Sequence, residues 1–173
     1  MSATIKLLLA ACLLLPASLL RAQLLTNPGF ESGLDDWTVT EKTSISSSTA
    51  EAAYEGKAGL RINDESADSG ANIASSRFDV TPGQKITLKF MARSPNGTIA
   101  SVSILPYGSS SQPLLDEKGR PPTNVVIKQS SDWAHYAVEY VVPQEASAFT
   151  ISIRSWSTPT GIVDLDNFEL KIE

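Results

Sequence analysis

Cysteine and histidine are nearly absent from this 173-residue chain, which has one of each. With Cys12 as its single cysteine, the chain cannot form an internal disulfide, and no Cys/His metal cluster can be assembled. His135 precedes Tyr136 in a strand-like segment, and adjacent strand residues point to opposite faces, so the two side chains cannot act as one catalytic pair. We therefore expect His135 to be an ordinary residue, and the domain to be held by its hydrophobic core or by a metal ion.

The chain also lacks an excess of positive charge, with a formal net charge of -5. This balance offers no basic surface for nucleic acid or for anionic lipid. No phosphate-binding glycine loop and no nucleophile elbow occurs in the sequence. Carboxylate pairs for glycoside hydrolysis need a defined separation across a cleft, and the conceivable members are Asp35, Asp36, Glu139, Asp164 and Asp166. We expect that the protein binds no nucleic acid and is not an enzyme.

A long hydrophobic run occurs only near the start of the chain. Lys6 precedes an apolar stretch over residues 7–20, and Ala22 offers a small residue for cleavage. The stretch is short and interrupted for a membrane-spanning helix, which needs about 20 apolar residues. We predict a bacterial signal peptide over residues 1–22 and one domain over 23–173, secreted or periplasmic and without membrane insertion. A lipoprotein acylated at Cys12, in the Leu9-Ala-Ala-Cys12 segment, is the alternative.

Helical periodicity is missing beyond residue 23. Apolar and polar residues instead alternate over short segments separated by Gly, Pro, Asn and Ser. About ten short strands are expected, among them Trp37–Thr40, Ala58–Asn63, Ile73–Val80, Lys85–Arg93, Ala100–Leu105, Val125–Lys128, Ala134–Val142, Phe149–Arg154 and Ile162–Ile172. This spacing predicts an all-β jelly-roll β-sandwich of two antiparallel sheets, with a long Ser-, Gly- and Pro-rich loop over residues 107–122.

One carboxylate interrupts the alternation of apolar and polar residues in the last predicted strand. Counting by twos, Asp166 shares a face with Phe168, Leu170 and Ile172. A carboxylate buried on an apolar face needs an ion-pair partner or a metal ion. Alternatively, Asp166 lies at the start of the strand and is solvated.

Several motifs in order resemble bacterial carbohydrate-binding modules of the cellulose-binding-domain C group, families four, nine and twenty-two. They are Asn27-Pro-Gly-Phe-Glu31, Gly33-Leu-Asp-Asp-Trp37, Glu55-Gly-Lys-Ala-Gly-Leu-Arg-Ile62, Val80-Thr-Pro-Gly-Gln-Lys-Ile-Thr-Leu88, Asp132-Trp-Ala-His-Tyr136 and Leu165-Asp-Asn-Phe-Glu-Leu170. The resemblance implies a jelly roll and a structural calcium ion near the chain ends. It implies Glu31, Asp166 and the carbonyls of Gly29 and Lys57 as ligands, with Glu51 or Glu55 as a further carboxylate. Such a donor mixture suits Ca²⁺.

Aromatic residues make up only 7% of the chain, so each can be weighed as a sugar platform. Trp37 and Trp133 are expected to pack in the core or cover its end, and Tyr136 and Tyr140 to face the core. Trp156 is expected to point outward with Arg154 nearby, and the alternative is a Trp folded over the sandwich rim. The further ligand candidates are Tyr107 and Arg93, followed by Gln112 and Asn124.

Together these observations predict a secreted, monomeric, non-catalytic carbohydrate-binding module for a polysaccharide or oligosaccharide. An extracellular structural or protein-interaction domain without sugar binding is the alternative, and a polysaccharide-active enzyme is a third hypothesis.

Overall fold

The computed structural model describes residues 25–42, 45–97, 100–156, 158 and 160–173. The predicted signal peptide over residues 1–22, with Cys12, lies outside the described residues. Within the described ranges, no helix has the length and apolar character needed to cross a membrane. One short 3-10 turn, Ala50–Ala52, is the helical element that the structure assigns there.

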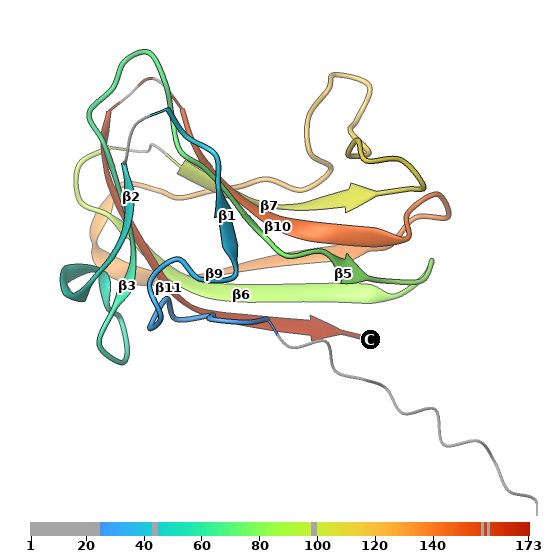
Figure 1. Ribbon diagram of the computed structural model, residues 1–173, viewed down its shortest axis with the longest axis horizontal. Coiled ribbons are helices and arrows are strands. Elements are labelled where there is room, and N and C mark those ends of the chain that lie inside the picture. The colour runs from blue at the N-terminus through green and yellow to red at the C-terminus, as the bar shows by residue number, and fades with distance from the viewer. Residues whose placement is uncertain (1–24, 43–44, 98–99, 157, 159) are drawn as a thin grey trace, which may run out of the picture.

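Two antiparallel sheets pack face to face (Figure 1). The six-stranded sheet contains, in spatial order, β1 (Trp37–Val39), β4 (Asn72–Ser75), β10 (Ala148–Ser155), β7 (Ala100–Tyr107) and β8 (Val125–Val126), and β5 (Phe78–Asp79) also pairs with β10. The five-stranded sheet contains β2 (Ser46–Thr49), β3 (Gly59–Asp64), β11 (Gly161–Ile172), β6 (Lys85–Ser94) and β9 (Ser130–Val141). The prediction of an all-β jelly-roll sandwich is confirmed.

The core lies between the sheets and follows the predicted alternation. Ile86, Leu88 and Phe90 on β6 are buried, and so are Ile151 and Ile153 on β10. Side chains of period two on both strands therefore point into one shared interior.

An aromatic cluster closes one region of this core. The rings of Phe30, Trp37, Phe90 and Phe168 are in contact, with centroid separations of 5.0 to 5.9 Å. The indole N–H of Trp37 donates a hydrogen bond to the carbonyl of Asn27, which satisfies its one polar atom. The cluster attaches the N-terminal segment to the last strand, as expected for Trp37.

Two strand predictions were wrong in detail. The predicted strand Ile73–Val80 is divided into β4 and β5, because the Ser75 hydroxyl accepts the hydrogen bond of the Ile151 N–H and donates to the Ser76 carbonyl. A side chain that takes over a backbone bond interrupts the regular ladder. Strand β2 was not predicted, because its sequence Ser-Ser-Ser-Thr has no apolar alternation.

The predicted face of Asp166 was also wrong. Strand β11 contains a bulge between Asp166 and Glu169, where Asn167 has a φ of 51°. An extra residue reverses the alternation, since a one-residue shift moves every following side chain to the other face. Asp166 therefore points away from the core, on the side of Asp164, whereas Phe168 after the bulge points inward.

Candidate functional site

The outward faces of the two sheets differ in chemistry. On the five-stranded sheet the outward side chains include exposed charged residues such as Lys85, Lys89 and Glu139. On the six-stranded sheet they include small hydroxyls that are almost fully buried, although they point away from the core: Ser101, Ser103, Thr150 and Ser152. Neighbouring loops must therefore shield this second face from solvent and make it the floor of a hollow.

A hollow of about 690 Å³ lies on this floor. Its lining residues come from β7, from the end of β10 and from the loop that follows β7: Ser101, Ser103, Asp116, Arg120, Pro121, Pro122, Asn124, Arg154 and Trp156. Figure 1 shows the segment between β7 and β8 extending away from the sandwich beside β7. The predicted long loop thus supplies one wall of the hollow.

Side-chain hydrogen bonds hold the returning end of this loop against β7. The Thr123 hydroxyl accepts from the N–H of Ile104 at 2.8 Å, and the Ser103 hydroxyl donates to Asn124 Oδ1 at 3.2 Å. Asn124 was an expected polar candidate, and the structure places it in the hollow. Gln112 is exposed and is not among the lining residues.

A tight turn over residues 116–120 forms the outer part of the wall. Asp116 accepts hydrogen bonds from the N–H groups of Lys118 and Arg120, each at 2.8 Å, and from the Arg120 guanidinium at 2.9 and 3.1 Å. The Arg120 N–H, with help from the Arg120 side chain and the Lys118 N–H, lowers the pKa of Asp116. The oxygens of this carboxylate are therefore engaged in hydrogen bonds within their own turn.

Trp156 and Arg154 stand beside each other at the edge of the floor. Trp156 is 39% exposed, as predicted for an outward side chain, and Arg154 is exposed as well. Arg154 makes no hydrogen bond or ion pair within the described part of the chain. It also lines a second hollow of about 470 Å³, together with Asp68 and Asn72, so Arg154 borders both hollows.

The other two predicted ligand residues lie elsewhere. Tyr107 ends β7, at the opposite end of that strand from Ser101, and the Arg77 guanidinium covers its ring at 4.0 Å. Arg93 belongs to β6 in the five-stranded sheet. Neither residue lines the hollow beside Trp156. The structure brings Trp156 and Arg154 together and separates Tyr107 and Arg93 from them.

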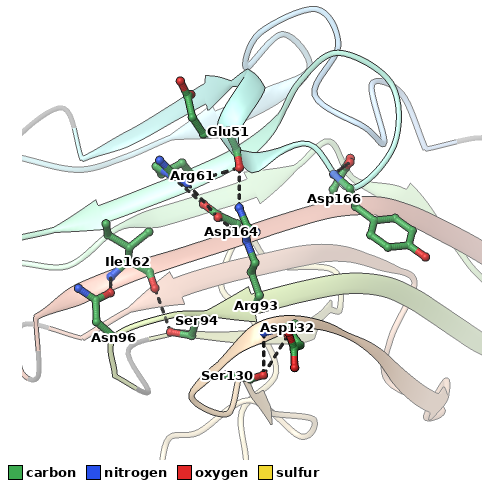
Figure 2. A network of polar contacts seen from close by, with 11 residues as sticks. Glu51, Arg61, Arg93, Ser94, Asn96, Ser130, Asp132, Ile162, Asp164 and Asp166 are labelled. Atoms are coloured by element: carbon green, nitrogen blue, oxygen red, sulfur yellow. Dashed lines mark hydrogen bonds and ion pairs between the residues drawn. The ribbon is translucent and has the colours of Figure 1, made fainter.

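Arg93 takes part in a polar network on the five-stranded sheet (Figure 2). The buried carboxylate of Asp164 accepts from Arg61 at 2.7 and 3.0 Å and from Arg93 at 2.9 Å. Arg93 also donates to the Glu51 carbonyl at 2.6 Å. Asp164 raises the pKa of the Arg61 guanidinium through this hydrogen bond and its charge.

Trp133 was expected to pack in the core or to cover its end; it lies on the same outward face as Arg93, so it does not pack in the core. It is half-buried between the Arg93 guanidinium, 4.8 Å from the ring centroid, and the ring of Tyr54, at 5.5 Å. Odd-numbered residues of β9 face outward while Val138 faces the core, which explains its position.

The predicted metal ligands meet where the N-terminal segment reaches β11. Asp166 Oδ2 accepts from the N–H groups of Tyr54 and Glu55 at 2.7 and 3.0 Å. Glu31 Oε1 accepts from the N–H groups of Lys57 and Ala58 at 2.8 and 3.3 Å. Here Lys57 contributes a donor, and no group of three or more Asp, Glu, His or Cys suited to a metal occurs among the described residues.

Two further details bear on whether these residues fit a cation. A side-chain atom added at Gly29 would lie 3.4 Å from Asp166 Oδ1 and 3.8 Å from Glu31 Cγ, so both carboxylates flank this glycine. Glu31 Oε2 accepts no hydrogen bond within the described ranges. Carboxylate oxygens beside backbone carbonyls are the donor mixture that Ca²⁺ takes, and the residues fit it in chemical type.

Comparison with known protein families identifies the class of this chain. The sequence profile of the Carbohydrate binding domain family matches residues 22–160, and the chain belongs to this family. The hollow on the six-stranded sheet is thus found in a sugar-binding module. No curated protein matches the chain significantly.

Solved structures with the same fold include other modules of this kind. A family 16 carbohydrate-binding module has 18% identity and a TM-score of 0.63, covering 85% of this chain and 98% of its own. A structure described as CBM4 has 12% identity and a TM-score of 0.61, with coverages of 86% and 99%. TmCBM61 in complex with β-1,4-galactotriose has 15% identity and a TM-score of 0.60, with coverages of 86% and 97%. At these identities the likeness concerns the fold.

Sequence reasoning did not select the floor of the hollow. Ser101 and Ser103 alternate with buried apolar residues, at positions where a solvent-exposed face would carry long charged side chains. A run of small hydroxyls on the polar face of a strand is the signal that could have identified it.

Proposed function

We propose that this chain is a secreted or periplasmic, non-catalytic module that holds a polysaccharide or oligosaccharide in the hollow beside Trp156. The observation that carries the proposal is an exposed Trp at the edge of a hollow with a floor of small hydroxyls. Aromatic rings pack on the apolar faces of sugar rings, and hydroxyl and amide groups bond to sugar hydroxyls.

The charged groups of the hollow support a binding function without catalysis. Asp116 is the one carboxylate among the described residues that line it, and that group is bound to Arg120 and two backbone N–H groups. Glycoside hydrolysis needs two carboxylates on either side of the bond that breaks. Of the carboxylates considered from the sequence, Glu139 and Asp164 pair with basic groups on the other sheet.

Glycan binding is tested with a glycan microarray, followed by calorimetry on the polysaccharides that bind in the array. We expect Trp156→Ala to weaken binding by roughly 5- to 150-fold, since loss of a stacking contact with an aromatic ring costs about 1–3 kcal/mol. Tyr54→Ala is the matched control, because Tyr54 is 42% exposed but lies beside Trp133 on the other sheet.

Four results lead to different conclusions. Binding that is lost in Trp156→Ala and kept in Tyr54→Ala, with unchanged melting temperatures, supports the proposed site. Equal loss in both variants refutes it. If no plant, algal or bacterial glycan binds, sugar binding is refuted and a structural or protein-interaction domain is favoured. Release of new reducing ends or unsaturated sugars refutes the non-catalytic assignment.

We further propose that a structural calcium ion occupies the junction of Glu31 and Asp166, with the carbonyls of Gly29 and Lys57 as further ligands. The ion would join the N-terminal segment to the last strand and add its binding free energy to folding. Melting with and without EDTA tests this, and we expect a lower melting temperature with EDTA that excess Ca²⁺ restores. An unchanged midpoint means that the backbone N–H groups alone hold the two carboxylates.

A further inference from the structure

We propose that the glycan bound in the hollow beside Trp156 carries an acidic group, a carboxylate or a sulfate, and that Arg154 binds it. This inference rests on the proposed function and names the substrate class of the same site. It starts from a comparison of the arginines that the structure describes.

Each of the other described arginines already has a partner. Arg61 and Arg93 bind the Asp164 carboxylate, and Arg120 binds Asp116. Arg77 lies over the Tyr107 ring and donates to the Ser111 carbonyl. Arg154 alone among them has neither an acceptor nor a ring contact in the described residues, and it is also the one beside the exposed Trp.

On the side of the Trp156 hollow, no unpaired carboxylate of the described residues compensates the charge of Arg154. Its cross-strand neighbours in the register of the sheet are Asn72 on β4 and Ser101 on β7, both neutral. The other two charged residues that line the hollow, Asp116 and Arg120, pair with each other. The hollow therefore has a surplus of positive charge in a chain whose formal net charge is -5.

The chemistry of the guanidinium group defines the ligand. Its planar array of N–H donors matches two oxygens of a carboxylate or sulfate, and such charge-assisted bonds are roughly twice as strong as neutral ones. Uronic acids and sulfated sugars combine such a group with a ring that can pack on Trp156. The second hollow is lined, besides Arg154, by Asp68, Glu41 and Lys42, so its other charged residues are negative on balance, and the acidic group is assigned to the Trp156 side of Arg154.

Matched pairs of polysaccharides test the proposal. The probes are glucuronoxylan, polygalacturonate and alginate with their carboxyl-reduced counterparts, and a sulfated galactan with its desulfated form, measured by calorimetry at constant salt. We expect at least one acidic member to bind roughly tenfold tighter than its neutral counterpart. The carboxylate and sulfate pairs show which anion is preferred.

Variants then assign the effect to one residue. We expect Arg154→Gln to bring the affinity for the acidic member to within about threefold of its neutral counterpart, and Arg154→Lys to keep part of the preference. Arg77→Gln is the control and should keep it all. Arg154 is exposed, so melting temperatures of its variants should match the wild type.

The possible failures are distinct. If neutral and acidic members bind equally, or if the preference persists in Arg154→Gln, the acidic-ligand proposal is overturned while glycan binding stands. If no acidic probe binds but neutral glycans do, the same conclusion follows. If no glycan of either kind binds, the proposed function fails together with this inference.

Discussion

Asp164 provides the sharpest test of how the five-stranded sheet is held together. Its carboxylate is fully buried, and it accepts three hydrogen bonds of 2.7 to 3.0 Å from Arg61 and Arg93. The substitution Asp164→Asn keeps the shape of the side chain but removes its charge. It also replaces one acceptor oxygen with an NH₂ donor that faces a guanidinium.

The size of the effect follows from the environment of the three side chains. A hydrogen bond to a charged group contributes about 1.5–3 kcal/mol, and removing one member of a buried ion pair costs about 3–5 kcal/mol. The Arg61 and Arg93 side chains are 24% and 26% exposed, so water recovers part of the loss. We therefore expect the free energy of unfolding to fall by about 3 kcal/mol, which for a chain of this size lowers the melting temperature by roughly 6–12 °C.

Calorimetric melting of wild type and Asp164→Asn measures the shift. Asp79→Asn is the matched control, since it removes the same charge from an exposed aspartate whose side chain makes no bond within the described ranges, and its melting temperature should change little. A shift for Asp164→Asn no larger than that of the control would refute the reasoning. The high pKa of Arg61 adds a second expectation: because it is raised above an already basic value, the pair should not weaken between pH 6 and 9 through arginine titration.

Three further predictions concern packing, backbone geometry and pH. Phe168→Ala removes a ring that touches Phe30, Trp37 and Phe90. In denaturant titrations it should lower the free energy of unfolding by about 3–5 kcal/mol. A loss below about 1 kcal/mol would mean that the aromatic cluster does not stabilise the attachment of the last strand. Gly56→Ala places a methyl group against Glu31 Oε1 at a φ of +72°, so its melting temperature should fall further than that of Gly119→Ala, which has the same φ and open space. The lowered pKa of Asp116 means that its carboxylate stabilises the turn above the unfolded pKa of about 3.9, and this contribution is lost as pH falls through the folded value. Amide NMR shifts in this turn should therefore titrate with a midpoint below about pH 3.9, and a midpoint at or above that value contradicts the hydrogen bonds that Asp116 accepts.

The sequence by itself determined the strands with strong alternation and the direction of their side chains. The pattern over Lys85–Arg93 predicted β6, whose alternating Ile86 and Leu88 are buried, and the pattern before Trp156 predicted its exposure. These features depend on a period of two residues, which is a local property of the chain. The ordered motifs along residues 27–170 also predicted the carbohydrate-binding family that the profile match confirms.

The tertiary structure decided which of those side chains meet. The bulge at Asn167 moved Asp166 to the outer face, because one unpaired residue reverses the alternation and no residue type marks it reliably. Pairing of β10 with β7 placed Ser101 beside Arg154. Pairing of β11 with β3 and β6 instead placed Asp164 next to Arg93, with which it forms an ion pair. Local periodicity tells which residues point outward, but the contacts of distant strands determine whether an outward arginine is already paired or is open to a ligand.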